Sequence, residues 1–310
     1  MFDSFDFVQQ LVLPAALFGV MVTVGMELTR RDFRDLVAAP RGFLIGGAIQ
    51  LTLFPAIAVL VLWVVPLPVA TAVGLAIVAA CPSGGFSNVL TLLGRGDLAL
   101  SISLTTISSV LAILTLPIVL AFALAVADTG AGEQDVVSVP LLPTLGQLFM
   151  VVLLPVALGM WARATHPAWV QRNIDRVQQA AQVLLYGVVL VVAIQDWKPF
   201  SAGIEASFPL AALMFILSAG GGYFLAIAFL PRAQAFTVAI ETGTRNVGLS
   251  TLVAISVLDR VDWAAFGAVY ILPASALGFA AALAHRRAQR RDRQRARALE
   301  QQQVGRAPGP

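Results

Sequence analysis

The chain has 310 residues, of which 58% are hydrophobic and 12% charged, and its formal net charge is +3. An ordinary soluble domain carries about twice that share of charged residues, so the composition excludes this class. The apolar residues fall in blocks of about 20, the length that a helix needs to cross the hydrocarbon core of a bilayer. We therefore expect an all-α, multi-pass membrane protein, in which the single Cys81 cannot form an intramolecular disulfide.

The apolar blocks predict nine transmembrane helices in one domain over residues 1–284. The remaining residues, 285–310, are rich in arginine and glutamine and are expected to form a disordered cytoplasmic tail. Such a tail favours anionic lipid headgroups over nucleic acid as its partner. The nine predicted segments have the approximate bounds 7–28, 42–65, 69–93, 98–127, 141–161, 177–194, 208–230, 235–258 and 264–284.

The basic residues between the segments separate into two sets that lie on alternate loops. The sparse set contains only Lys198 and Arg260. Loops rich in lysine and arginine favour the cytoplasmic side, so the N-terminus is expected outside and the C-terminus inside a cell membrane, plasma or bacterial inner. The rich set contains Arg30, Arg31, Arg34, Arg41, Arg95, Arg163, Arg172, Arg176, Arg232 and the tail.

Two segments carry interruptions near their middle, at residues 81–97 in the third and 241–248 in the eighth. Backbone that is not helical survives at membrane depth only where it is buried in protein or lines a polar cavity. Ser87-Asn88-Val89 in the first interruption is echoed by Arg245-Asn246-Val247 in the second. Because the two segments cross in opposite directions, this pattern predicts an inverted-topology repeat with two broken crossing helices and a binding site between them.

Several sequence motifs lie at and near these interruptions. They are Cys-Pro-Ser-Gly-Gly-Phe-Ser-Asn (81–88), Gly-Asp-Leu-Ala-Leu-Ser (96–101), Leu-Thr-Thr (104–106), Gly-Met-Glu-Leu (25–28), and Glu241, Gly243, Asn246 and Gly248-Leu249. In these motifs the sequence resembles the bile acid:sodium symporter family. The resemblance implies a panel of segments one, five and six, a core of segments two to four and seven to nine, and sodium-coupled transport of an organic anion by alternating access.

The same resemblance implies a sodium site between the two interruptions. Ser101 and Thr105 are four residues apart and share one face of a helix. The alternative reading is that these small polar residues only allow close helix packing. The residues that match the family's first sodium site are Ser87, Asn88, Ser101, Thr105 and Glu241.

Arg245 departs from the family pattern, which usually has a glutamine that helps to form a second sodium site, together with a residue matching Gln50. A guanidinium has no acceptor and cannot ligate sodium. We therefore expect an altered second site at Gln50 and Arg245, in which a fixed cation reduces the coupling from two sodium ions to one. The alternative is an internal ion pair between Glu241 and Arg245, which are four residues apart.

An anionic substrate, bile acid-like or a small carboxylate, is expected at the ends of the broken helices, where free N–H groups and the helix dipole favour negative charge. Proton coupling through Glu241, or a sodium-independent carrier or exporter of the same superfamily, is the alternative function. We see no zinc, serine-elbow or paired-aspartate pattern of an intramembrane enzyme. Asp97 is expected to cap the fourth segment. The expected substrate contacts are Ser83, Gly84, Gly85, Phe86, Asn88, Arg245 and Asn246.

Overall fold

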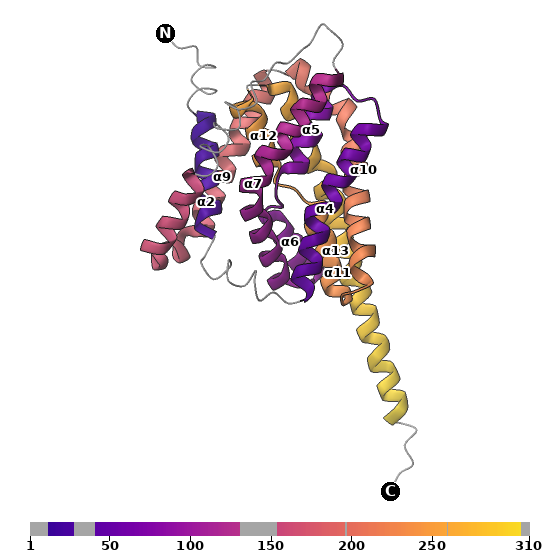
Figure 1. Ribbon diagram of the computed structural model, residues 1–310. Helices are drawn as coiled ribbons and strands as arrows, with labels where there is room; N and C mark the ends of the chain where they lie inside the picture. Colours follow the sequence, from indigo (N-terminus) through magenta and orange to yellow (C-terminus); the bar gives the residue numbers. More distant parts are fainter. Residues whose placement is uncertain (1–11, 28–40, 131–153, 196, 259, 305–310) are drawn as a thin grey trace, which may run out of the picture.

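Every regular element in the part of the chain that the structure describes is a helix, which confirms the all-α prediction. The computed structural model describes residues 12–27, 41–130, 154–195, 197–258 and 260–304 (Figure 1). The helices are α2 (Leu13–Glu27), α4 (Arg41–Val64), α5 (Val69–Ala80), α6 (Gly85–Gly94), α7 (Leu98–Gly130), an unlabelled helix over residues 154–165, α9 (Pro167–Gln195), α10 (Trp197–Ile227), α11 (Arg232–Gly243), α12 (Val247–Leu252), the π-helix η2 (Val253–Val257) and α13 (Val261–Val304).

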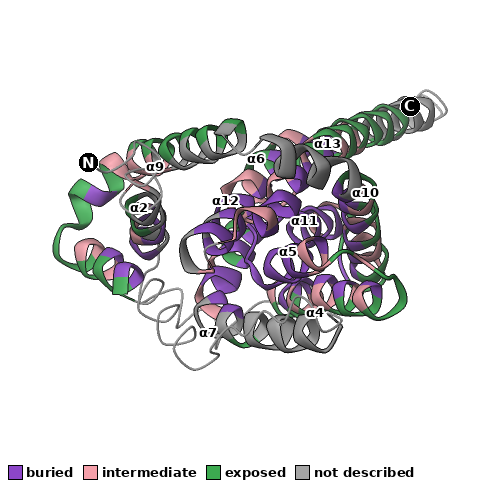
Figure 2. Cartoon of the chain, turned by 90° about the horizontal axis from the view of Figure 1, so that it is seen from above, coloured by how far each residue is buried: buried purple, intermediate pink, exposed green. Residues whose placement is uncertain are grey.

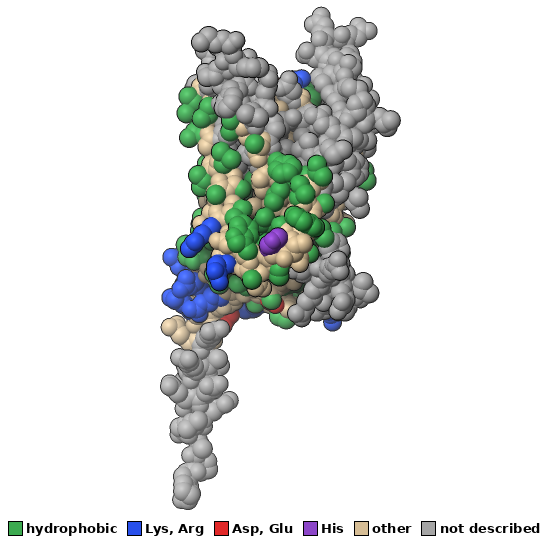
Figure 3. All heavy atoms as spheres, turned by 90° about the vertical axis from the view of Figure 1, so that its left-hand side faces the viewer, with side chains coloured by type: hydrophobic (Ala, Val, Ile, Leu, Met, Phe, Trp, Pro, Cys, Tyr) green, Lys and Arg blue, Asp and Glu red, His purple; other side chains and the backbone are tan. Residues whose placement is uncertain are grey.

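Three of the described helices are long and apolar enough to cross a membrane, and the bent pair α5 and α6 counts as a fourth span. Large hydrophobic side chains point outward from them, such as Trp63, which is 85% exposed. Figure 3 shows hydrophobic side chains over the described part of one face, with lysine and arginine gathered below them. This surface fits a lipid environment, while the count of nine helices stays a prediction, because parts of segments one and five lie outside the described residues.

The structure corrects several predicted boundaries. The residues 162–176 and the stretch around Lys198 were expected to be loops, but α9 already begins at Pro167 and α10 at Trp197. The structure describes residues 285–304 of the predicted tail as helix, because α13 continues through Val304. Hydropathy marks only where a helix is apolar, whereas alanine, arginine, glutamine and glutamate also favour helix in water. A helix that is already nucleated extends easily through such residues.

The described helices pack as two groups. In a smaller group, α2 packs against α9 and against the helix over residues 154–165. Gly25 and Gly159 allow the close approach, because a Cβ at either position would overlap a backbone carbonyl of the facing helix. The other helices form a larger group that holds most of the buried residues, and the two groups stand side by side in both views (Figures 1 and 2).

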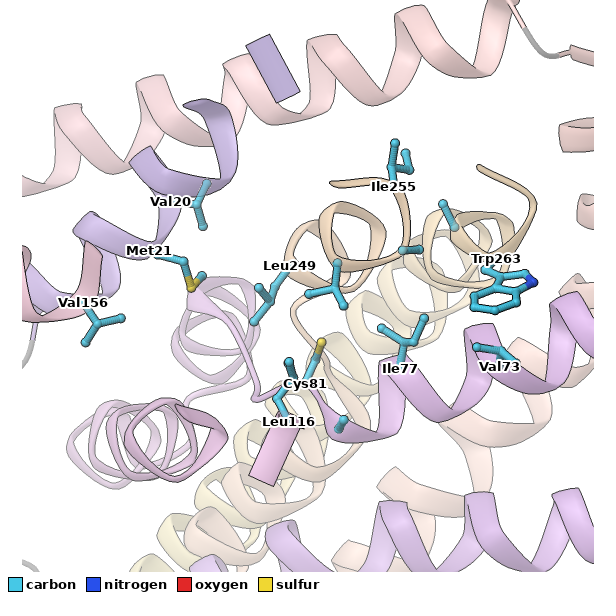
Figure 4. Close-up of a cluster of buried hydrophobic side chains, with 14 residues drawn as sticks. Val20, Met21, Val73, Ile77, Cys81, Leu116, Val156, Leu249, Ile255 and Trp263 are labelled. Atoms are coloured by element: carbon cyan, nitrogen blue, oxygen red, sulfur yellow. The ribbon is translucent and has the colours of Figure 1, made fainter. Parts of the chain in front are cut away.

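An apolar cluster joins the two groups beside the first interruption. Val20 and Met21 of α2 share this cluster with side chains of α5, α12 and α13. Figure 4 shows Cys81 in its midst, near Leu249 and Ile77. Cys81 is buried and free, and the two groups meet here through apolar side chains.

Candidate functional site

The two predicted interruptions are present, and they touch each other. α5 ends at Ala80 and α6 begins at Gly85, with a bend of 70° between them. α11 ends at Gly243 and α12 begins at Val247. The backbone N–H of Asn246 donates a hydrogen bond of 2.8 Å to the carbonyl of Pro82, so each interruption satisfies part of the other's backbone.

Local sequence explains why both helices break where they do. Pro82 has no N–H to donate and holds Cys81 in an extended conformation (φ −73°, ψ 146°). Thr244 is likewise extended (φ −91°, ψ 139°) at the end of α11. The Asn246 side chain then caps the start of α12, because its Oδ1 accepts a hydrogen bond of 3.0 Å from the N–H of Leu249.

The carboxylate of Glu241, on the last turn of α11, lies at the centre of a cluster of hydroxyl groups and is 0% exposed. Ser83 donates to its Oε2 at 2.6 Å and Ser87 to its Oε1 at 2.6 Å. Thr105 contacts both carboxylate oxygens, at 3.1 and 3.0 Å, and Ser101 donates to Oε1. Four hydroxyls from the first interruption, α6 and α7 thus converge on one buried negative charge.

Asn88 joins this cluster indirectly. Its Oδ1 accepts a hydrogen bond of 2.8 Å from Ser101, whose hydroxyl also contacts Thr91 at 3.2 Å. The structure therefore brings together all five residues that the sequence assigned to a sodium site: Ser87, Ser101 and Thr105 contact Glu241, and Asn88 is one side chain away. The set contains hydroxyl, amide and carboxylate oxygens, which are the ligands that hard cations prefer.

The sequence reasoning missed two hydroxyls of the cluster. Ser83 was expected to contact a substrate. Its hydroxyl also belongs to the hydroxyl cluster, where it lies 3.4 Å from the hydroxyls of both Thr105 and Ser108. Ser108 follows Ser101 and Thr105 at helical spacing on α7, so its place on the same face could have been read from the sequence. The role of Ser83 required the fold, because its side chain direction is set by the non-helical backbone between α5 and α6.

Asp97 fixes the start of α7, and with it the hydroxyl-bearing face. Its Oδ1 accepts a hydrogen bond of 3.1 Å from the N–H of Leu100, which confirms the predicted cap. Its own N–H donates to Thr237 of α11 at 2.8 Å, and Gln234 of α11 donates to its Oδ2 at 3.0 Å. These bonds tie the start of α7 to the helix that carries Glu241.

Arg245 is buried, and it does not pair with Glu241. Its Nη1 donates to the Cys81 carbonyl at 3.3 Å and its Nη2 to the Gln50 carbonyl at 3.2 Å, while its guanidinium lies 4.3 Å from the ring centre of Phe54. The alternative of an internal ion pair is therefore wrong. Spacing of four residues brings side chains together only in a helix, and the extended Thr244 breaks that spacing.

Gln50 connects the hydroxyl cluster to the guanidinium. Its Nε2 donates to Ser83 at 3.1 Å, and its backbone carbonyl accepts from Arg245. Within the part of the chain that the structure describes, its Oε1 and the Nε of Arg245 are buried atoms that lack a hydrogen-bond partner. The two predicted members of a second site are thus in direct contact, beside backbone carbonyls and a free side-chain oxygen.

The residues that were expected to hold an anion lie around the crossing point. A Cβ at Gly84 would lie 3.6 Å from the side chain of Asn246, and one at Gly85 would lie 3.5 Å from Nε2 of Gln178 on α9. Phe86 is half-buried and packs edge-on against Phe279. The N-terminal turn of α6 therefore faces both the second interruption and the smaller group of helices.

Comparison with known proteins gives a consistent picture. A sequence model described as the "Sodium Bile acid symporter family" matches residues 14–202. The chain is 29% identical to the "Uncharacterized sodium-dependent transporter YocS" of Bacillus subtilis, over 83% of this chain and 79% of that protein. It is 31% identical to the human P3 protein and 29% to human "Sodium/bile acid cotransporter 4", over 80% and 77% of this chain. The chain spans about half the length of these two human proteins (50% and 54%).

Proposed function

We propose, because the chain belongs to the sodium bile acid symporter family, that it is a secondary active transporter that couples the movement of one sodium ion to that of an organic anion. The family is one of sodium-dependent transporters, and the relatives whose names state a role are named as transporters. The observation that carries the proposal is the buried Glu241 carboxylate, which four hydroxyls surround where two interrupted helices cross.

Sodium is proposed to bind between Glu241 and the oxygens of Ser87, Asn88, Ser101 and Thr105. A buried carboxylate is costly unless a cation or several donors compensate its charge. Each hydroxyl that now donates to Glu241 also has lone pairs, so a small rotation would turn it toward a cation beside the carboxylate. Because these residues come from α6, α7 and α11, sodium would stabilise the arrangement in which the two interruptions meet, and it thereby favours one state of the carrier.

Arg245 is proposed to replace a second sodium ion. The guanidinium takes up the carbonyl oxygens of Cys81 and Gln50, which are groups of the kind that ligate sodium. The side-chain Oε1 of the same Gln50 is buried and has no hydrogen-bond partner among the described residues. A permanent cation there excludes a mobile sodium ion, because it repels the ion and occupies the space that the ion would need. The same contacts favour a fixed interior role for Arg245 over direct contact with the transported anion.

The anion is proposed to bind at the N-terminal turn of α6, where the N–H groups of Gly85 and Phe86 have no partner within the helix. Ser83, Gly84, Asn88 and Asn246 border this turn in the larger group, and Gln178 approaches it from the smaller group. A carboxylate of a bile acid-like molecule or of a small metabolite fits this chemistry. The bound carboxylate would contact residues of both helix groups, as alternating access requires.

The proposed architecture has nine helices in a cell membrane, plasma or bacterial inner, with the N-terminus outside and an inverted repeat. Segments one, five and six would form the panel, which the mutual packing of α2, α9 and the helix over residues 154–165 supports. The remaining helices over the first 284 residues would form the core. The crossing of the two broken helices supports the repeat.

A thermal-shift screen tests this function. Purified protein is melted in sodium chloride and in potassium chloride of equal ionic strength, with and without a panel of organic anions. We expect sodium at about 100 times its Kd to raise Tm by roughly 5 °C, because ligand at that excess stabilises by about 2.7 kcal/mol. One class of anion should add a further shift only with sodium. Equal melting in both salts, with a shift that follows pH alone, would favour the proton-coupled alternative.

A further inference from the structure

The first turns of α13 beyond its apolar part contact two half-helices: α6, which carries Ser87 and Asn88, and α11, which carries Glu241. His285 donates from Nδ1 to the carbonyl of Gly94 at 2.9 Å, and its ring stacks on Phe236 with centroids 4.2 Å apart and planes 4° apart. Gln289 donates to the carbonyl of Arg95 at 3.1 Å. Gly94 and Arg95 end α6, so these two side chains cap carbonyls that would otherwise lack a partner.

The same turns also hold the start of α11. Asp292 forms an ion pair of 3.0 Å with Arg232, the first residue of α11, and Phe236 lies one turn further along that helix. We call His285, Gln289 and Asp292 the C-terminal clamp. It connects α6, which carries Ser87 and Asn88, to α11, which carries Glu241, at the end of each helix that lies away from the crossing point.

Arginines crowd around the clamp. Arg287, Arg290 and Arg291 are exposed on its turns, and Arg286 is partly exposed. Arg95 and Arg232, both exposed, lie against the clamp residues. Within the described turns 285–292, Asp292 is the acidic residue, so positive charge predominates on these turns.

The depth of this cluster matches that of lipid headgroups. Ala284 is the last apolar residue before the arginines. With a rise of about 1.5 Å per residue, residues 286–291 lie within about 11 Å of it along the helix. The headgroup layer on each side of a bilayer is roughly 5–8 Å thick, so the first of these turns lie within it and the next at its aqueous edge.

We propose that this arginine cluster binds the headgroups of anionic phospholipids, and that the bound lipid strengthens the C-terminal clamp. Guanidinium groups match phosphate geometry, and several of them beside one membrane surface attract anionic lipid. Arg286 and Arg290, like Arg287 and Arg291, are like charges four residues apart, which destabilise a helix. A lipid phosphate between them removes that repulsion, so the lipid favours the helical turns on which the clamp depends.

The consequence for the cation site rests on the proposed function. A firmer clamp holds α6 and α11 in the relative position that brings Ser87 and Asn88 to Glu241. Anionic lipid is therefore expected to raise the apparent affinity for sodium. Lipid binding itself does not depend on transport, so the two statements are tested by separate measurements.

The experiment titrates the purified full-length protein with fluorescent phosphatidylglycerol or phosphatidylcholine and measures polarisation. We expect the Arg287→Gln, Arg290→Gln, Arg291→Gln triple variant to bind phosphatidylglycerol about a hundredfold more weakly, since each arginine near an anionic surface contributes about a fivefold factor. The matched control removes Arg163, Arg172 and Arg176 around the start of α9 and should keep most of the affinity. Replacing the three clamp-side arginines by lysine should also keep it, which separates charge loss from misfolding.

Three results would overturn the proposal: equal affinity of wild type and the glutamine variant, equal affinity for the two lipids, or displacement of the lipid by millimolar glycerol phosphate alone.

In the second measurement, the sodium titration of Tm is repeated with each lipid. We expect phosphatidylglycerol to lower the sodium concentration for half-maximal shift in wild type, and not in His285→Ala, Gln289→Ala. A sodium response absent in every lipid contradicts the proposed function instead, and leaves the lipid-binding result standing.

Discussion

Replacing Glu241 by glutamine is expected to abolish the stabilisation by sodium and to lower sodium-driven anion uptake at least a hundredfold. The carboxylate is fully buried and is the only negative charge that the four surrounding hydroxyls contact among the described residues. Removing one partner of a buried ion pair costs about 3–5 kcal/mol, which corresponds to roughly a hundredfold or more in affinity. The measurement is the sodium-dependent change in Tm, followed by uptake into proteoliposomes with a sodium gradient.

Asp97→Asn is the matched control for Glu241→Gln. Asp97 is also a carboxylate of the larger helix group, and it caps α7 rather than contacting the hydroxyl cluster. An asparagine still caps a helix, so the control is expected to melt within a few degrees of wild type and to keep its full sodium shift. A Glu241→Gln protein that folds and still gains the wild-type stabilisation from sodium would show that the cation is held elsewhere.

Replacing Arg245 by glutamine is expected to create a second sodium site and to raise the Hill coefficient for sodium from about one to about two. The substitution frees the carbonyl oxygens of Cys81 and Gln50 and adds an amide oxygen beside the unpartnered Oε1 of Gln50. It also removes a fixed positive charge that repels a cation. The measurement is the sodium dependence of uptake in proteoliposomes, together with the charge moved for each anion.

Arg245→Met and Arg245→Lys are the controls for the new site. Methionine removes the charge without adding an oxygen ligand, and lysine keeps a cation on a flexible stem. Both are expected to leave the Hill coefficient near one. If Arg245→Gln also leaves the Hill slope and the charge movement unchanged, Arg245 does not stand in for a sodium ion.

The position of the site could be predicted from the sequence because the signals lie in the residues themselves. Pro82 interrupts a regular helix and the glycines after it disfavour one, and Ser101 and Thr105 are spaced for one helix face. Oxygen-bearing side chains next to two such interruptions indicate a polar centre at membrane depth. The hydrogen bonds to Glu241 agree with this prediction, although the identity of the bound ion remains a proposal.

The direction of individual side chains could not be predicted in the same way. Ser83 donates to Glu241, whereas Arg245 donates to backbone carbonyls, because both residues lie in the non-helical backbone of an interruption. Sequence spacing carries no information on side-chain direction once the helix is broken. Helix ends at Pro167, Trp197 and Val304 were missed for another reason: a polar helix gives no hydropathy signal.

Equilibrium binding of radioactive sodium to the purified protein tests the central claim most directly. We predict one saturable site per chain in the wild type, which Glu241→Gln eliminates and Asp97→Asn retains, with potassium unable to compete at equal concentration. Saturable binding that survives Glu241→Gln, or the absence of any saturable binding in the wild type, would contradict the assignment of the hydroxyl cluster as the sodium site.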